Sequence, residues 1–220
     1  MESLTEATET IHAEVTKDQS EVRADFLKHF GAQLPPFCAS MANAVLKWRH
    51  IDAGSEISEE HAHVSAFVYA AIALHIQSTR LFLSGHLVAA GNLARQVTEA
   101  IALALLSSGK SLTVLRRFIA GTYSTNKAVD DVCRHHKVLR LRKDGLEALR
   151  NSQRFNHHYS HVTRMTIASL TSFADEGLYV GAAFDEGKLD AYRKEMAGRV
   201  NLARVFPNFI DAVDANLEDW

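Results

Sequence analysis

The chain has 220 residues, of which 47% are hydrophobic and 23% are charged, and its formal net charge at pH 7 is −2. These values are typical of a globular protein with a sizeable core, and they exclude a disordered, collagen-like or disulfide-dense chain. Only three prolines occur. Because proline interrupts helices and strong helix formers are abundant, the composition predicts long α-helices instead of a strand-rich fold.

Apolar periodicity and turn residues predict four helices in the first half of the chain. Gly31 stops the first helix, and Ser58 followed by early acidic residues is typical of a helix start. The fourth helix is apolar nearly all round, so we expect it at the centre of a bundle. The four helices are expected over residues 3–30, 37–50, 58–83 and 87–107.

The second half of the chain is less regular. Residues 163–174 are expected either to continue the preceding helix or to form one of their own. Residues 177–187 are expected to form an irregular segment or a short hairpin arm. Pro207 either kinks the last long helix or opens a final one that ends near residue 217. Helices are expected over residues 112–141, with an interruption near Gly121, over 146–161 and over 189–205.

Together these elements predict an all-α, single-domain bundle of seven to nine helices. Cys38 and Cys133 lie far apart and lack the spacing of a zinc site, which favours a reduced, cytoplasmic protein. No secretory signal is predicted, because the N-terminal residues are acidic and include no apolar stretch. No membrane span is predicted, because polar residues interrupt even the most apolar stretch. The predicted division is into N-terminal helices (1–57), a central bundle (58–175) and C-terminal helices (176–220).

Residues 150–164, RNSQRFNHHYSHVTR, are the densest cluster of groups that donate, accept or carry a proton near pH 7. If this segment is helical, successive residues are rotated by about 100°. Arg154 and His161 then lie within about 20° of each other, two turns apart, and His157 lies between them on the same face. Ser160 falls at the margin of this face.

Such a set of side chains suits cleavage of a phosphodiester. A histidine with a pKa of about 6.5 exchanges a proton at neutral pH, and an arginine holds a phosphate through paired N–H donors. In RNA the 2′-hydroxyl would attack its own phosphate, while His161 transfers a proton and Arg154 offsets the charge of the transition state. This chemistry requires no metal and no other cofactor.

Two other interpretations of the segment are open. His157 and His161 have the i, i+4 spacing of two metal ligands on one helix face, although no acidic residue accompanies them. The chain also contains twelve histidines. The cluster is therefore explained as well by hydrogen-bonded surface positions without a function.

Arg95 and Glu99 form a second constellation, four residues apart in the apolar helix over 87–107. A charge pair in a central helix is costly to desolvate unless it meets further partners. The pair is expected either to fix the helix in register or to face residues 154–161 across the core and orient a histidine. In the second case, Arg80 is expected to join the same polar pocket.

An apolar helix with Arg-x3-Glu, followed by a later helix with Arg-x6-His, resembles the HEPN superfamily of helical bundles, which is common in bacterial toxin and defence systems. The resemblance covers about residues 60–165. Nuclease members of that superfamily cut RNA without metal, usually as dimers whose motifs meet at the interface. The resemblance implies that Arg154 and His161 are the active pair, supported by Glu99. The residue after the arginine is usually polar in that superfamily, whereas Phe155 stands here.

The distribution of charge along the chain is consistent with an anionic partner. Residues 111–164 carry a net charge of +7, which is typical either of an anion-binding face or of a solvated helix surface. The leading hypothesis is a metal-independent endoribonuclease of a bacterial defence or toxin–antitoxin type, in which Arg95, His157 and Ser160 support the catalytic pair. Its expected partners are RNA or a nucleotide, a second copy in a homodimer, and an antitoxin-like protein. The alternative is a non-catalytic helical module that binds a nucleotide, nucleic acid or protein through the same face.

Overall fold

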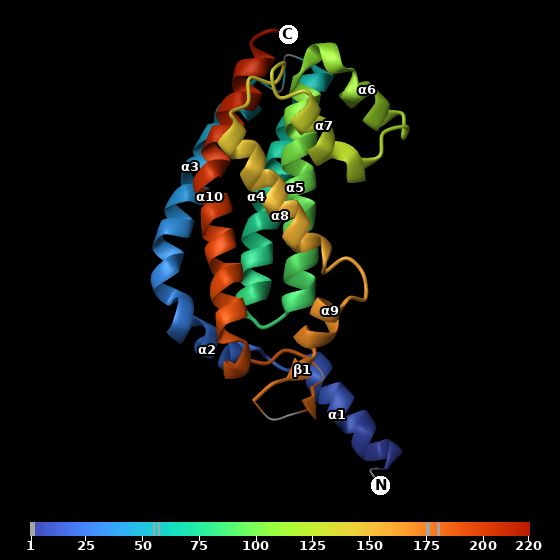
Figure 1. The fold of residues 1–220 in the computed structure, drawn as a ribbon, viewed down its shortest axis with the longest axis vertical. Helices are drawn as coiled ribbons and strands as arrows, with labels where there is room; N and C mark the ends of the chain where they lie inside the picture. The colour runs from blue at the N-terminus through green and yellow to red at the C-terminus, as the bar shows by residue number, and fades with distance from the viewer. Residues whose placement is uncertain (1–2, 55, 57, 175–176, 180) are drawn as a thin grey trace.

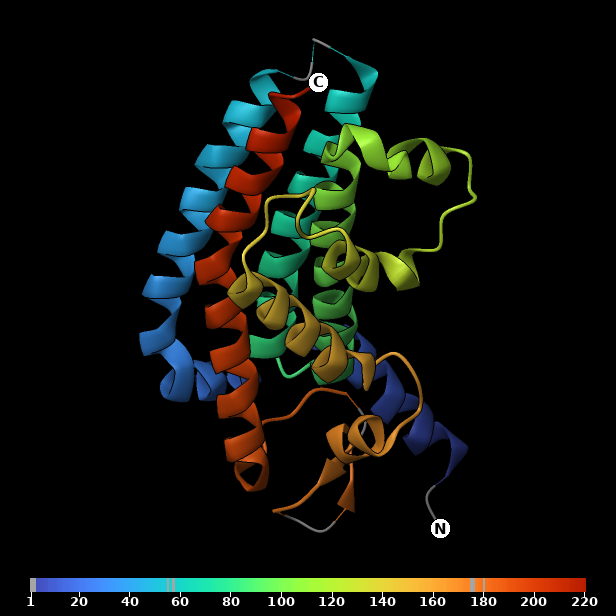
Figure 2. The same cartoon turned by 45° about the horizontal axis from the view of Figure 1, so that its top comes forward.

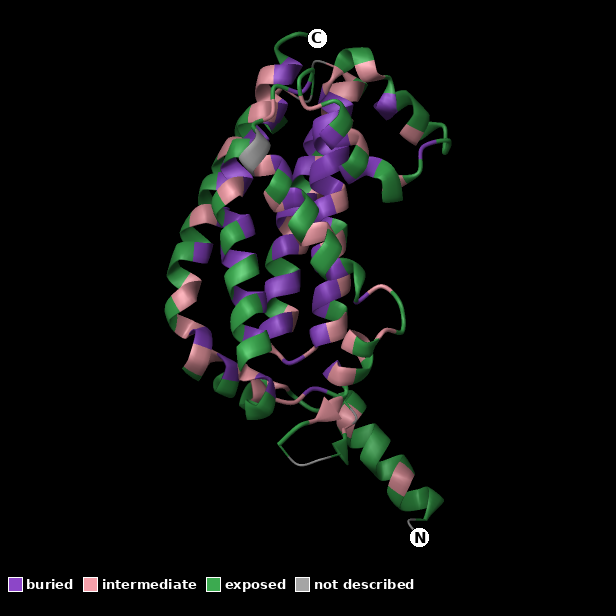
Figure 3. Ribbon diagram, in the orientation of Figure 1, coloured by how far each residue is buried: buried purple, intermediate pink, exposed green. Residues whose placement is uncertain are grey.

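The apolar stretch in the middle of the chain forms the central helix, as its composition predicted. Helix α5 spans Leu87–Ser108, and every residue from 100 to 108 is buried. Its most extensive neighbour is α4, Glu59–Leu83, which Ser58 caps by accepting a hydrogen bond from the His61 amide. Figure 3 shows buried residues concentrated along α5. Apolar side chains all round α5 explain why other helices cover it on several sides.

Four long helices lie side by side along the longest axis of this computed structural model (Figure 1). Helices α3, Leu34–Ala53, and α10, Leu189–Leu217, join α4 and α5 in this group, and α10 contacts each of the other three. Helix α8, Lys143–His157, lies across α5 and α10 (Figure 2). The structure describes residues 3–54, 56, 58–174, 177–179 and 181–220.

Shorter elements cover the two ends of this group. Helix α2 packs against α4, and α6 and α7 cover one side of α5. The remaining α-helices are α1 (Leu4–Thr16), α2 (Ser20–Phe30), α6 (Val114–Ile119), α7 (Ala128–Arg134) and α9 (Arg164–Ser169). Single-turn 3₁₀ helices are η1 (Gly31–Gln33), η2 (Lys110–Leu112), η3 (Thr125–Lys127) and η4 (Glu186–Lys188). The prediction of an all-α, multi-helix bundle is confirmed.

A two-stranded antiparallel ribbon follows α9. Strand β1, Thr171–Ser172, pairs with β2, Gly177–Leu178, with Thr171 opposite Leu178. The predicted irregular or hairpin segment over 177–187 is therefore confirmed for its described residues, and position 180 lies outside them. Residues 163–174 contain a helix of their own, α9, and do not continue α8.

Three predicted helix boundaries were wrong. The single helix over 3–30 is divided between α1 and α2, and α1 has no buried residue and projects from the body of the molecule (Figure 1). The expected helix over 112–141 is interrupted near Gly121, as predicted, but only the short helices α6 and α7 remain of it. Thr113 and Gly121 adopt left-handed backbone conformations that a continuous helix excludes. Of the two alternatives for Pro207, the one in which it opens a separate final helix was wrong, because α10 continues through it to Leu217.

Aromatic rings form the core where α2, α4 and α10 meet. Phe82 is fully buried, and its ring centroid lies 5.2 Å from that of Phe26 and 6.2 Å from that of Tyr192. The Arg199 guanidinium lies 4.7 Å from the Phe82 ring centroid, which is a cation–π contact. Phe82 therefore joins the apolar core to the buried charges of α10.

Among the described residues, α4 is the one helix whose length and apolar composition would suffice to cross a membrane. Less than half of its most apolar window, 44%, is buried within the protein. The central helix of a helical bundle has the same properties, and α4 packs against α2, α3, α5 and α10.

We expect Phe82→Ala to lower the free energy of unfolding by about 3–5 kcal/mol, because it removes a fully buried ring from close-packed surroundings. The half-exposed Ile119 provides the control, and Ile119→Ala should change the free energy of unfolding by no more than about 0.5 kcal/mol. Urea denaturation of the two variants measures both values. Equal effects of the two substitutions would show that this core assignment is wrong.

Candidate functional site

Helix α8 ends earlier than the sequence pattern predicted. It stops at His157, and the chain then turns, with the Ser160 amide donating to the His157 carbonyl at 3.2 Å. The proposed helical face that joined Arg154 to His161 is therefore wrong in its geometry, since His161 and Ser160 lie beyond the helix. Among the described residues, no hydrogen bond or ion pair connects Arg154 with His161.

The structure nevertheless gathers basic and imidazole groups at this end of α8. Arg150, Arg154 and His157 are separated by four and three residues, so they share one face of the helix within about 60°. The turn returns His161 to this face, and its ring centroid lies 5.4 Å from that of His157. All four side chains are exposed. We call Arg150, Arg154, His157 and His161 the basic face.

Two hydrogen-bonded contacts hold the turn that carries His161. The Thr163 hydroxyl donates to the His158 carbonyl at 2.6 Å, and the Thr166 hydroxyl donates to the His161 carbonyl at 2.7 Å. The same two threonines form the capping box of α9, Arg164–Ser169. The start of α9 thus fixes the backbone of His161 relative to the end of α8.

Tyr159 anchors this turn from the inside. Its ring is buried, and its hydroxyl donates to the Glu195 carboxylate on α10. Burial, followed by the adjacent carboxylate, raises the pKa of Tyr159, so the phenol stays protonated and remains a donor. This hydrogen bond, which is shielded from solvent, therefore joins the turn to α10.

Glu195 belongs to a larger buried polar network. Its other carboxylate oxygen accepts from Arg199 Nη1 at 3.0 Å, and both side chains of this ion pair are 4% exposed. Arg199 Nη2 lies 3.5 Å from the Ser78 hydroxyl, which itself donates to the Ala90 carbonyl at 2.7 Å. The network thus connects α10 with α4, α5 and the turn after α8.

His75 closes the network on α4. It is fully buried, its ring stacks on Phe206 with centroids 5.4 Å apart, and its Nε2 lies 3.0 Å from the Arg199 carbonyl. Because a carbonyl only accepts, Nε2 carries the proton of the neutral ring. Burial, which outweighs that hydrogen bond, lowers the pKa of His75 to about 3.

A glycine on α5 makes room for Tyr159. A Cβ atom built on Gly91 would lie 2.2 Å from ring atoms of Tyr159. Real Cβ atoms do not approach other atoms so closely, so any other residue at position 91 would displace the ring. Gly91 is therefore required for the bond between Tyr159 and Glu195.

Arg95 and Glu99 are paired, and among the described residues no hydrogen bond or ion pair joins them to the basic face. Arg95 Nε donates to Glu99 at 2.9 Å, and its Nη2 donates to Asn126 of η3 at 2.8 Å. The pair is partly buried and holds the segment between α6 and α7 onto α5. Arg80 is exposed and lines a different surface depression, near α2, so its expected place in a shared pocket was wrong.

Sequence reasoning missed Arg150, Tyr159, Glu195 and Arg199 as members of this region. Burial raises the pKa of the Cys133 thiol on α7, and the Arg150 guanidinium, which lies near that thiol, opposes the shift. The i, i+4 spacing of Glu195 and Arg199 was visible in the sequence. That spacing is common on helix surfaces, so it gave no sign that this pair is buried.

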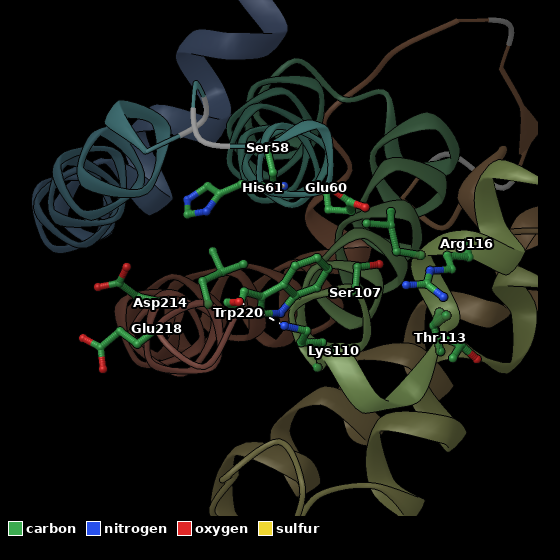
Figure 4. A pocket seen from close by; sticks show the side chains of 14 residues that line it. Ser58, Glu60, His61, Ser107, Lys110, Thr113, Arg116, Asp214, Glu218 and Trp220 are labelled. Carbon is green, nitrogen blue, oxygen red and sulfur yellow. Dashed lines mark hydrogen bonds between the residues drawn. The ribbon is translucent and has the colours of Figure 1, made fainter.

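Another cavity lies at the C-terminal end of α5. It has a volume of about 560 Å³ and is formed by the start of α4, the ends of α5 and α10, and α6. Figure 4 shows Asp214 and Glu218 on one side of it and Arg116 on the other. Ser107 at its wall lies sixteen residues after Gly91 on α5, which corresponds to roughly 24 Å along the helix. This cavity is therefore remote from the basic face.

A metal site has no support in the described part of the chain, where no three His, Cys, Asp or Glu side chains gather closely enough to hold an ion. His157 and His161 are thus two potential ligands without a third. Ser160 is half-buried, and its hydroxyl has no hydrogen-bond partner among the described residues.

No protein-family model matches the chain, and neither a curated protein nor a solved structure is significantly similar to it. The geometry of the chain itself therefore carries the functional argument.

Replacing Gly91 by alanine should lower the free energy of unfolding by about 1–3 kcal/mol, since the added methyl group overlaps the Tyr159 ring. Gly198 on α10 is a matched control, because a Cβ there meets no atom within 4 Å. Gly198→Ala should leave stability unchanged or raise it by about 0.5–1 kcal/mol through helix propensity. Thermal denaturation compares the two, and a Gly91→Ala variant as stable as Gly198→Ala would contradict the packing described for Tyr159.

The buried His75 predicts a dependence of stability on pH. Its pKa is about 3 in the folded protein against 6.5 for the free group, so only the unfolded chain binds this proton between those values. Stability should therefore fall as the pH is lowered from about 6.5 towards 3, with a contribution from His75 of up to about 1.4 kcal/mol per pH unit. His75→Gln keeps an N–H donor for the Arg199 carbonyl and does not titrate. Urea denaturation between pH 7 and pH 4 should show a shallower slope for this variant, and equal slopes would contradict the assignment.

Proposed function

We propose that the protein is a metal-independent endoribonuclease whose catalytic groups are the basic face of α8 and the turn after it. The observation that carries the proposal is the exposed pair of imidazoles, His157 and His161, with ring centroids 5.4 Å apart beside two guanidinium groups. Two imidazoles this close together can approach the same phosphodiester. Imidazole is the side-chain group best suited to exchange protons at neutral pH.

In the proposed reaction, the neutral imidazole of one histidine accepts the proton of the RNA 2′-hydroxyl. The 2′-oxygen then forms a bond to phosphorus, and the bond from phosphorus to the 5′-oxygen breaks. The protonated imidazole of the other histidine gives its proton to that leaving oxygen, which yields a 2′,3′-cyclic phosphate and a 5′-hydroxyl. Arg150 and Arg154 offset the negative charge that develops on the phosphoryl oxygens.

In this proposal Arg150, in place of Arg154, is the arginine that best fits the HEPN resemblance. Arg150 and His157 are also separated by six residues, and both lie within α8 on one face. The residue after Arg150 is the polar Asn151, as is usual in that superfamily, whereas Phe155 follows Arg154. We therefore place Arg150 with His157 as the primary pair, and Arg154 with His161 as its extension towards the substrate.

A second copy of the chain is part of this proposal. The basic face is exposed, and an exposed surface does not exclude water from a reacting phosphodiester. Val162 and Ile167, which are exposed apolar residues, lie in the turn and in α9 next to His161. A homodimer that buries them would enclose the basic faces of both copies in one cleft.

The test is cleavage of single-stranded RNA by purified protein in EDTA. We expect products with 2′,3′-cyclic phosphate ends, and we expect His157→Ala, His161→Ala and Arg150→Gln each to lower the rate by about 10²–10⁴-fold. His12→Ala is the control, because His12 is an exposed histidine on the projecting helix α1. Cleavage that is absent from the wild type, or unchanged in all three variants, would sink the proposal. RNA binding that weakens steeply with salt, without any product, would instead support a non-catalytic module.

A further inference from the structure

A second cavity lies beneath α8, on the flank of the helix away from the basic face. Its volume is about 480 Å³, which is within the usual range of small-molecule sites. Helix α8 contributes Ala148, Asn151, Ser152, Phe155 and Asn156, and the opposite wall is formed by α10. These positions lie about half a turn around the helix from Arg150, Arg154 and His157. The cavity and the basic face are therefore separate surfaces of one helix.

The inner end of this cavity is polar but carries no net charge. His75, Glu195 and Arg199 line it, and each is at most 5% exposed. The carboxylate and the guanidinium neutralise each other, and His75 is uncharged. Two of their atoms, His75 Nδ1 and Arg199 Nε, have no hydrogen-bond partner among the described residues. A ligand that reached this end would meet one acceptor and one donor instead of an unpaired charge.

The walls of the cavity suit a flat ring with polar edges. Asn156 uses its amide nitrogen to donate to the Ser152 carbonyl at 2.9 Å, which leaves its Oδ1 as an acceptor. Asn201 accepts from Arg204 through Oδ1 at 3.5 Å, which leaves its amide nitrogen as a donor. Small and apolar side chains separate these amides, and the partly exposed Phe155 ring provides an aromatic surface. Nucleobases are bound in this way, by stacking on aromatic rings and by hydrogen bonds to their edges.

One cationic side chain at the cavity is not paired with a carboxylate of any described residue. Lys194 is exposed, lines the cavity and forms no ion pair with any described residue. An ammonium group in such a position binds a phosphate as a point charge. From the neutral inner end, the amide walls, the aromatic ring and this lysine, we infer that the cavity is a binding site for a nucleoside 5′-monophosphate. Binding there is distinct from RNA cleavage on the basic face.

The test is isothermal titration calorimetry of the full chain with guanosine and adenosine 5′-monophosphate, the two nucleosides, and ribose 5-phosphate. We expect at least one monophosphate to bind with one site per chain, its nucleoside to bind about tenfold more weakly, and ribose 5-phosphate not to bind. Lys194→Gln should weaken binding of the monophosphate about tenfold while leaving the nucleoside unchanged. No binding of any base-containing probe, or equal binding of ribose 5-phosphate, overturns the inference.

A matched pair of glycine variants locates the bound molecule. Gly198 lines the cavity, and a Cβ atom there meets no protein atom within 4 Å, so we expect the side chain of Gly198→Leu to extend into the cavity without disturbing the fold. Gly31 in η1 is equally open and remote from the cavity, so Gly31→Leu is its control. We expect Gly198→Leu to weaken binding more than about tenfold, with an unchanged melting temperature, and Gly31→Leu to bind normally. If Arg154→Gln abolishes binding while Gly198→Leu does not, the nucleotide occupies the basic face and the inference is wrong.

Discussion

The ion pair between Glu195 and Arg199 is the constraint on which the rest of this structure depends. Two charges taken out of water are costly, and they persist only where each finds partners with good geometry. Here the carboxylate is held by Tyr159 as well as by the guanidinium, which lies over the Phe82 ring. Removing one member of such a pair typically costs about 3–5 kcal/mol, because the other charge is left buried and unpaired. The helices that supply these partners must therefore stay in register.

This requirement explains how a surface turn comes to be well positioned. His157 and His161 are exposed and form no hydrogen bond to the core through their side chains among the described residues. Tyr159, between them, is buried and bound to α10, and the capping box of α9 holds the following backbone. The imidazoles thus project from a turn whose middle is fixed inside the protein. A catalytic group needs such support, because misplacement by about 1 Å costs much of its effect.

Helix α8 also separates three environments around its circumference. Leu146 and Leu149 face the core, Arg150 and Arg154 face solvent, and Phe155 lines the cavity against α10. The helix carries many polar groups, and only a narrow apolar stripe holds it against α5. This arrangement places a ligand cavity and a basic surface on the two flanks of one element.

The sequence predicted the fold class and the central helix because those follow from composition and apolar periodicity. It predicted α4 well because Ser58 and the acidic residues after it form a local helix start. It failed where contacts between residues far apart in the sequence determine the local structure. Helix α8 ends at His157 because Tyr159 turns inward to a carboxylate 36 residues later in the chain, and no local signal records that bond. For the same reason, no local signal distinguishes Glu195 and Arg199 from a pair on a helix surface.

The charge pattern shows a similar limit. The cluster over 150–164 was visible as a set of residue types, and its polar members are indeed divided between inside and outside. Asn156 is buried and His157 is exposed, as the helical period requires. Which arginine shares a helical face with a histidine depended on where the helix ends. Arg150 therefore became the better partner only once that boundary was known.

The most direct test of the central claim is hydrogen exchange at the backbone amides of Tyr159 and Ser160, which close the turn after α8. If the buried bond to Glu195 holds this turn, Tyr159→Phe should speed exchange of both amides by about tenfold or more while the amides of α5 stay protected. Tyr123→Phe removes a comparable bond, from a tyrosine hydroxyl to Asp131, at a different place and should leave both amides unchanged. Unaltered protection in Tyr159→Phe would contradict the account, because the turn would then be held by something other than the buried network.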